Sequence, residues 1–153
     1  MSRTKYRVSR NAAEEGPRIG ALLRLAWQRI RGRIYSGVRA DGYDDLNPAH
    51  VALFRYEGLH GQRPTQLAES MQITKQSVND LIRHLERCGY AESRSDPKDK
   101  RARLVYLTPR GRQLEAAVQK HAREAESELE GELGRDRLQE FLSTLRQISG
   151  LSS

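Results

Sequence analysis

The chain has 153 residues, of which 37% are hydrophobic and 31% are charged, a composition typical of one charge-rich globular domain. Its single cysteine, Cys88, excludes an internal disulfide framework, and its apolar runs are too short to span a bilayer. No apolar segment follows the basic first ten residues, so we expect no secretory signal, no membrane partner and a cytoplasmic location.

The formal net charge is +7, and the positive excess is concentrated in two segments. Residues 1–40 hold ten Lys and Arg against two Asp and Glu, and residues 61–112 hold eleven against six. Localised positive charge is typical of proteins that bind nucleic acid. Most of these cations are arginines, which can also reflect genome composition, so charge alone does not decide between the two explanations.

A basic arm and an amphipathic helix are predicted at the start of the chain. Residues 1–16 carry few apolar side chains, so we expect them to be disordered. From Ile19 to Ile34, apolar residues recur at the three- and four-residue spacing of one helix face. This spacing predicts that the first helix begins directly after the arm.

A loop and a second helix follow. Residues 37–45 are expected to form the loop, because they contain the turn dipeptide Asp41-Gly42. Asn47 and Pro48 are typical of an N-cap and of the first helical position. We expect the helix that they begin to end around residues 58–61.

Two further helices are predicted in close succession. Pro64 suits the start of one helix, Thr74 is a good N-cap for the next, and Gly89 closes it. Only two or three residues separate these helices, so they cannot lie antiparallel and must cross at a steep angle, as in a helix-turn-helix. Ala68 is small where the two helices would touch, and Ile73 is expected to insert its side chain into the core.

A β-hairpin is predicted directly after this pair of helices. Tyr90–Arg94 and Arg103–Leu107 have strand character, and the loop Ser95–Ala102 between them has eight residues. A helix-turn-helix followed by a hairpin is a winged helix. The sequence therefore predicts a winged helix-turn-helix.

The remainder of the chain is predicted to be helical. Thr108 and Pro109 repeat the N-cap and proline pattern, and Gly134 separates a long helix from a last one. The apolar faces of Ile19–Ile34 and Leu138–Leu151 exceed what a small winged-helix core needs. We expect the terminal helices to pair across a two-fold axis, although they could also cap their own core.

The segment Leu67–Gly111 resembles the multiple-antibiotic-resistance regulator (MarR) family of bacterial transcription factors. The resemblance rests on Leu67-Ala68, on "ITKQSVNDLIRHLERCGY", on Asp96-Pro97, on Asp99-Lys100-Arg101-Ala102, on the following "LT" and on Gly111. It implies a winged-helix homodimer that binds a pseudo-palindromic operator in double-stranded DNA, usually as a repressor released by a ligand or an oxidant.

The start of the second helix of the pair is the candidate base-reading element. A helix N-terminus offers unpaired N–H groups to phosphates, and short or forked polar side chains can meet base edges in the major groove. The residues with these properties are Thr74, Lys75, Gln76, Ser77, Asn79 and Arg83. Such residues can also be an ordinary solvated face, but their place between a tight turn and a wing favours DNA recognition.

The hairpin tip is the second candidate contact. Like charges at the tip repel one another. Their accumulation is explained if the tip approaches the phosphates or the minor groove of DNA. The candidate cations are Arg94, Lys98, Lys100, Arg101 and Arg103. The resemblance implies that Asp99 orients Arg101, which would enter the minor groove. The alternative is a flexible charged loop that its own composition keeps soluble.

An effector pocket is a further candidate, between the first, second and fifth helices. Trp27, Phe54 and Tyr56 would line it, although aromatic residues at helical spacing are more often plain core. The four histidines are scattered without metal-ligand spacing, and no nucleotide-binding or hydrolase motif occurs. We therefore predict no enzyme, no metal and no cofactor. A redox role for Cys88 is not favoured, because it lies at the end of the recognition helix.

Together these patterns predict a mainly α (α+β) protein. Residues 63–112 would form the winged helix-turn-helix lobe that binds DNA, and residues 17–62 and 113–153 a helical dimerisation region. The predicted function is a sequence-specific, nucleoid-associated transcription regulator. The alternatives are a winged-helix adaptor for an acidic protein partner and a non-specific nucleic-acid-binding protein.

Overall fold

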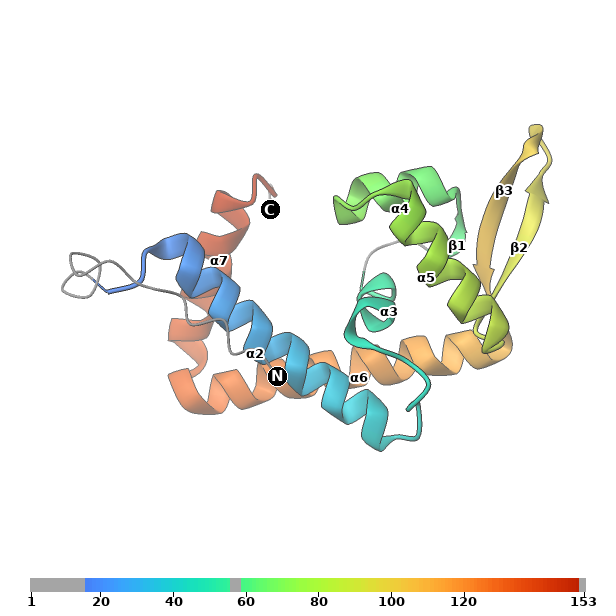
Figure 1. Ribbon diagram of the computed structural model, residues 1–153. Helices are drawn as coiled ribbons and strands as arrows, with labels where there is room; N and C mark the ends of the chain where they lie inside the picture. The colour runs from blue at the N-terminus through green and yellow to red at the C-terminus, as the bar shows by residue number, and fades with distance from the viewer. Residues whose placement is uncertain (1–15, 56–58, 152–153) are drawn as a thin grey trace, which may run out of the picture.

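The computed structural model describes residues 16–55 and 59–151 (Figure 1). Apart from Gly16, the predicted basic arm at residues 1–16 lies outside the described residues. Within 16–55 and 59–151, no helix is both long enough and apolar enough to cross a membrane.

Helices dominate the described part of the chain, and a small antiparallel sheet follows the order β1-β3-β2. The elements are α2 (Ile19–Ala40), α3 (Pro48–Leu53), β1 (His60–Gln62), α4 (Pro64–Met71), α5 (Lys75–Arg87), β2 (Ala91–Asp96), β3 (Asp99–Leu107), α6 (Pro109–Leu133) and α7 (Arg135–Ile148). The elements from α3 to β3 form one lobe, the C-terminal half of α2 packs against α3, α7 lies apart from the lobe, and the long helix α6 runs beneath them (Figure 1). The predicted winged helix-turn-helix of the mainly α (α+β) class is confirmed.

Three predicted helix starts are confirmed by their caps. The Asn47 side chain accepts hydrogen bonds from the backbone of Ala49 and His50, which begins α3. Thr74 caps α5 by accepting from a backbone N–H at 3.1 Å, and Thr108 caps α6 in the same way. Each cap satisfies a backbone donor that the helix itself cannot pair. Local chemistry therefore fixes where these helices begin.

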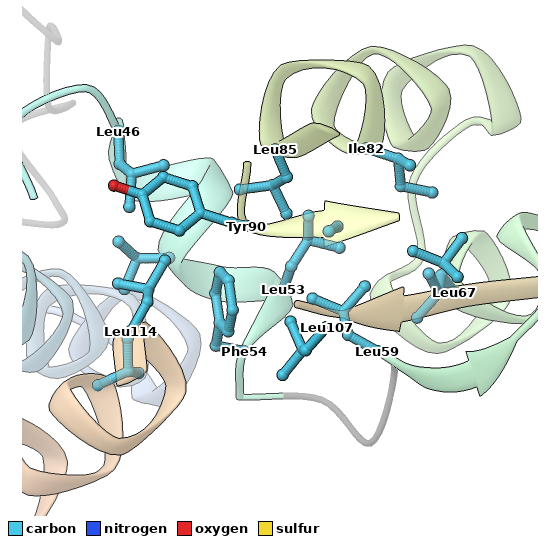
Figure 2. Close-up of a cluster of buried hydrophobic side chains, with 14 of the residues drawn as sticks. Leu46, Leu53, Phe54, Leu59, Leu67, Ile82, Leu85, Tyr90, Leu107 and Leu114 are labelled. Carbon is cyan, nitrogen blue, oxygen red and sulfur yellow. The ribbon is translucent and has the colours of Figure 1, made fainter. Parts of the chain in front are cut away.

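The core of the winged lobe is an apolar cluster built from α3, α4, α5, β2 and β3 together with the start of α6. Figure 2 shows these side chains converging between α5, the sheet and the start of α6. The labelled residues are Leu46, Leu53, Phe54, Leu59, Leu67, Ile82, Leu85, Tyr90, Leu107 and Leu114. Tyr90 is fully buried, and its hydroxyl donates to Asp45 at 2.8 Å, so its polar end is satisfied.

Two predicted helix ends were wrong. The first helix continues through residue 37 to Ala40, and the loop begins only at Asp41. It does so because the ring of His121 on α6 packs directly against Gly37, so burial holds this glycine in the helix. The second helix ends at Leu53 rather than near residues 58–61.

The sheet also differs from the prediction. The strands of the hairpin extend to Asp96 and from Asp99, so the connection has two residues instead of eight. The Asp96 carboxylate accepts the backbone N–H of Lys98 at 2.9 Å, which stabilises this tight turn. The third strand, His60–Gln62, was not predicted and pairs with β3.

Ile73, in the turn between α4 and α5, was predicted to insert into the core, but it is 36% exposed. Its backbone N–H donates to the carbonyl of Ala68 at 3.1 Å, and Gln72 before it has a left-handed backbone with φ of 53°. This C-cap closes α4 through the backbone, so the turn does not depend on burying a side chain.

A buried histidine joins the end of α2 to α6. The ring nitrogens of His121 lie 2.8 Å from carboxylate oxygens of Asp41 and Glu124. The hydrogen bond with His121 is the main cause that lowers the pKa of both Asp41 and Glu124. Glu124 also accepts a hydrogen bond from Arg33 on α2. These contacts fix the angle at which α2 crosses α6.

We predict that Gly37→Ala destabilises the protein and that Gly32→Ala in the same helix stabilises it. An added Cβ at Gly37 would lie 2.3 Å from the His121 ring, whereas nothing lies within 4 Å of the corresponding position at Gly32. The expected changes in unfolding free energy are a loss of about 1–3 kcal/mol and a gain of about 0.5–1 kcal/mol. Urea denaturation measures both, and equal effects at the two sites would contradict the packing of His121 on α2.

Candidate nucleic-acid interface

The helix α5 has one buried face and one exposed polar flank. Val78, Ile82 and Leu85 are fully buried against the core. The predicted base-reading residues lie on the other side: Thr74, Lys75, Gln76, Ser77 and Arg83 are exposed, and Asn79 is half-buried. The structure therefore brings this predicted set together on one accessible surface that follows the tight turn after α4.

A carboxylate that was not predicted as a site residue organises part of this flank. Asp80 accepts hydrogen bonds from the Gln76 amide at 3.1 Å and also from Arg83. Arg83 in addition donates to the backbone carbonyl of Asn79. The Gln76 and Arg83 side chains are thus held along the helix by Asp80, at the three- and four-residue spacings that bring side chains together.

Arg103 was predicted as a phosphate contact, but its guanidinium faces α5. It donates to the Asn79 side-chain oxygen at 2.8 Å and to the Ser93 hydroxyl at 3.4 Å, and it lies 3.9 Å from Glu86. Ser93 also donates to Glu86. These four residues connect both strands of the hairpin to α5 and hold the hairpin beside that helix.

Arg94 lies on the opposite face of the hairpin. Its guanidinium stacks 4.7 Å above the Tyr106 ring and also pairs with Glu92. Arg94 and Arg103 occupy neighbouring positions in the register between β2 and β3. Because successive residues of a strand point to opposite faces of the sheet, the two side chains nevertheless point in opposite directions. The two arginines therefore cannot have the same role.

The hairpin tip presents an exposed group of charges. Lys98, Asp99, Lys100 and Arg101 are all exposed, as expected for a tip that approaches a charged partner. Asp99 accepts a hydrogen bond from the backbone N–H of Arg101 at 3.1 Å. This contact shapes the chain at the tip, whereas the family resemblance implied a pairing with the guanidinium of Arg101.

The base of the tip is anchored by Asp96, which is only 6% exposed. One of its oxygens accepts from Arg63, before α4, at 3.0 Å, and the other accepts from the backbone of Lys98. The Lys98 N–H, followed by Arg63, lowers the pKa of Asp96. Sequence reasoning noted Asp96 only as part of a motif and gave no signal for Arg63, because their contact depends on the fold.

Of the residues of the predicted effector pocket, Trp27 lines a groove and Phe54 does not. Phe54 is 3% exposed and belongs to the core, and Tyr56 lies outside the described residues. Trp27 is 41% exposed, and the Arg55 guanidinium lies 3.8 Å above its ring. Trp27 and Arg55 line a groove of about 410 Å³ together with Ile30, Ile34, Ala122, Glu126, Leu129, Leu138, Phe141, Leu142 and Leu145.

The histidines and the cysteine serve local structure. Within residues 16–55 and 59–151, no group of three or more His, Cys, Asp and Glu could hold a metal ion. His50 and His84 stack with ring centroids 4.0 Å apart, and burial lowers the pKa of His50 to about 4. Burial also raises the pKa of the Cys88 thiol, which disfavours the reactive thiolate.

Comparison with known proteins points to one family. A model of the MarR family matches residues 44–102. The transcriptional regulator HosA of Escherichia coli O111:H- is 27% identical over 105 residues, which cover 69% of this chain and 78% of HosA. These matches confirm the resemblance that the sequence motifs indicated.

Solved structures agree over nearly the whole chain. A crystal structure of MarR superimposes with a TM-score of 0.75 at 22% identity and covers 95% of this chain and 94% of that one. The transcriptional repressor CouR, bound to a 23-mer DNA duplex, gives a TM-score of 0.71 at 25% identity and covers 94% and 99%. The similarity in fold therefore extends well beyond the matched segment, to the helices on both sides of it.

We predict that Asp96→Asn lowers the melting temperature (Tm) by a few degrees at pH 7, because the neutral amide cannot replace the charged partner of Arg63. The folded pKa of Asp96 lies below its ordinary value of 3.8. Its stabilising contribution is therefore complete above pH 3.8 and is lost as the pH falls through the lower, folded pKa.

The difference in Tm between the wild type and Asp96→Asn should thus narrow on acidification, which circular dichroism at pH 7 and near pH 3 measures. Asp99→Asn is the matched control, because that exposed carboxylate contacts only a backbone N–H on the same hairpin. An equal effect of the two substitutions at pH 7 would contradict the anchoring role of Asp96.

Proposed function

We propose that the chain is a transcription regulator of the MarR family, and that it is a repressor that binds a pseudo-palindromic operator as a homodimer and is released by a small ligand. The MarR family consists of regulators rather than enzymes, in agreement with the expectation from the sequence. The proposal assigns the DNA contacts to residues 63–112 and the dimer contacts to residues 17–62 and 113–153.

The observation that carries the proposal is the exposed polar flank of α5 beside a cationic hairpin tip. The major groove of B-DNA is about 12 Å wide and accepts one α-helix. With α5 in that groove, Lys75 and Gln76 at its first turn would reach base edges or phosphates. The repressor CouR, which shares the fold, has been solved on DNA, and its binding supports the same mode for this chain.

The hairpin tip supplies the second contact in this proposal. Lys98, Lys100 and Arg101 are exposed on the far end of β2 and β3, and the hairpin projects beyond α5 in Figure 1. A wing beside an occupied major groove faces the phosphates and the adjacent minor groove. Arg101 is the residue that we assign to the minor groove, because its planar guanidinium suits narrow, electronegative grooves.

The homodimer is supported by apolar surface on the terminal helices. Ile19 is 63% exposed and Leu22 and Leu25 are each 51% exposed on α2, while Phe141 is 43% and Ile148 is 58% exposed on α7. Exposed apolar residues that cluster on neighbouring helices typically mark an interface. One recognition helix reads only a few base pairs, whereas two helices about 34 Å apart read both half-sites of a palindrome.

The proposed ligand would occupy the groove next to Trp27. Its volume of about 410 Å³ lies within the usual size range of small-molecule sites. The lining is mainly apolar, with Arg55 and Glu126 as polar groups that could orient a ligand. The groove lies between α2, α6 and α7, so a ligand there would act on the helices proposed to form the dimer.

A titration against palindromic and random duplex DNA at two salt concentrations tests the function. A specific regulator is expected to prefer its operator by about 10³-fold or more and to bind more weakly as salt rises. A non-specific nucleic-acid binder would keep the salt dependence and lose the preference. An adaptor for a protein partner would show neither.

We predict that Arg101→Ala weakens operator binding by about 1–3 kcal/mol without loss of helicity, because its side chain is exposed at the tip and buries nothing in the free protein. Fluorescence anisotropy gives the affinity and circular dichroism the helicity. Arg123→Ala on the exposed side of α6 removes the same charge far from the interface and is the control. Equal losses for both variants would remove Arg101 from the site.

We predict that Phe141→Asp converts the dimer to monomers, because it places a charge in the apolar surface that the partner would cover. Sedimentation velocity measures the change. Ser143→Asp adds the same charge to an exposed position on another side of α7 and should leave the dimer intact. A dimer that survives Phe141→Asp would place the interface elsewhere.

A further inference from the structure

Asn79 has an unusual place on the recognition helix. It lies on the flank of α5 that faces the wing, and it is half-buried there, whereas Gln76 and Arg83 are exposed. A side-chain amide has a donor end and an acceptor end of nearly the same shape. The neighbours of an amide therefore decide which end points where.

Arg103 settles that choice for Asn79. A guanidinium carries only donors, so it must face the amide oxygen, and the two atoms lie 2.8 Å apart. The Asn79 oxygen is thereby turned toward β3, and its NH₂ group takes the other side. Both side chains are half-buried, which strengthens the hydrogen bond relative to an exposed one.

Arg103 is itself held in place. Its second terminal nitrogen donates to Ser93 at 3.4 Å and lies 3.9 Å from the Glu86 carboxylate. Ser93 donates to Glu86, so the hairpin and the helix share one hydrogen-bonded group. The orientation of the Asn79 amide is therefore set by a rigid element outside α5.

We propose that Arg103 is a positioning residue that fixes the donor–acceptor order of the Asn79 amide and thereby sets the base preference at one position of each operator half-site. This inference rests on the proposed function. It assigns Asn79 to a base edge in the major groove, where an amide of fixed orientation distinguishes bases and an amide free to flip does not. It also removes Arg103 from the phosphate contacts.

The two roles of Arg103 predict different results. A phosphate contact, when lost, weakens binding about equally on all sequences and reduces the salt slope by about one. A positioning residue, when lost, relaxes the preference at a single base position and leaves the salt slope unchanged. The base-preference profile therefore distinguishes the two roles of Arg103. The binding affinity for a single operator does not distinguish them.

The experiment selects bound sequences from a random duplex pool with the full-length wild type and with each variant. Arg103→Met removes the donors, and Arg103→Lys keeps the charge but not the planar fork that reaches both Asn79 and Ser93. Asn79→Ala removes the amide that contacts the base. Arg94→Met is the matched control, because it removes a guanidinium from the opposite face of the same hairpin.

We expect the wild type to prefer one base by roughly tenfold or more at the position that Asn79→Ala affects. Arg103→Met and Arg103→Lys should reduce that preference to within about threefold at the same position and leave the other positions unchanged, since each base contact is read separately. Arg94→Met should leave the preference at that position intact. Melting curves establish that every variant is folded before its profile is compared.

Asn79→Asp tests the same idea without removing Arg103's partner. The carboxylate still accepts from Arg103, but it has no donor left for the base, so the preferred base should change to one with an exocyclic amine. This variant keeps the inference testable even if both Arg103 variants unfold.

Three outcomes would overturn the inference. In one, Arg103→Met lowers affinity on all sequences and reduces the salt slope while Arg103→Lys restores both, which makes Arg103 a phosphate contact. In another, the Asn79 and Arg103 variants alter different positions or none. If the wild-type protein selects no sequence from the pool, the proposed function itself is wrong. That result is known before any variant is compared.

Discussion

The contact between the apolar face of α5 and the core is the constraint on which the rest of the site depends. Val78, Ile82 and Leu85 are fully buried, so the helix cannot rotate without exposing them. This contact fixes which side chains remain outside, and the exposed flank from Lys75 to Arg83 is its direct result. The set of polar side chains on this surface is thus determined by packing on the opposite face of the helix.

The wing is held by polar contacts at two levels, and its tip is left exposed. Asp96 ties the base of the tip to Arg63, and Arg103 ties the middle of the hairpin to Asn79. With both levels fixed, and with only two residues between the strands, little chain entropy remains to be lost when the tip meets a partner. The exposed cations are in this sense presented on a rigid support.

Much of the fold could be predicted because its signals are local. The caps at Asn47, Thr74 and Thr108 depend on the residue itself and on the helix that follows. The three-residue strand β1 could not be predicted, because such a short segment has no periodicity and owes its form to pairing with β3. The two strands of the hairpin were predicted too short and their loop too long, because polar residues such as Ser95 have little intrinsic strand preference.

In the candidate site, too, features that depend on local sequence could be predicted and features that depend on contacts between elements could not. The exposure of the α5 flank and of the tip could be predicted from the alternation of polar and apolar residues along the chain. The separate roles of Arg94 and Arg103 could not, because each is decided by a side chain on another element or on a neighbouring strand. Asp80 was not predicted as a site residue, because only its contacts with Gln76 and Arg83 show that it organises this flank.

The long helix α6 begins directly after the wing and runs unbroken for 25 residues to Leu133, next to α7. At 1.5 Å per residue it is a lever about 37 Å long. A tilt of about 5° at the α7 end displaces the other end by about 3 Å, close to the 3.4 Å between successive base pairs. A small tilt at the α7 end of α6 is therefore amplified into a displacement of the wing that is comparable to the spacing of base pairs.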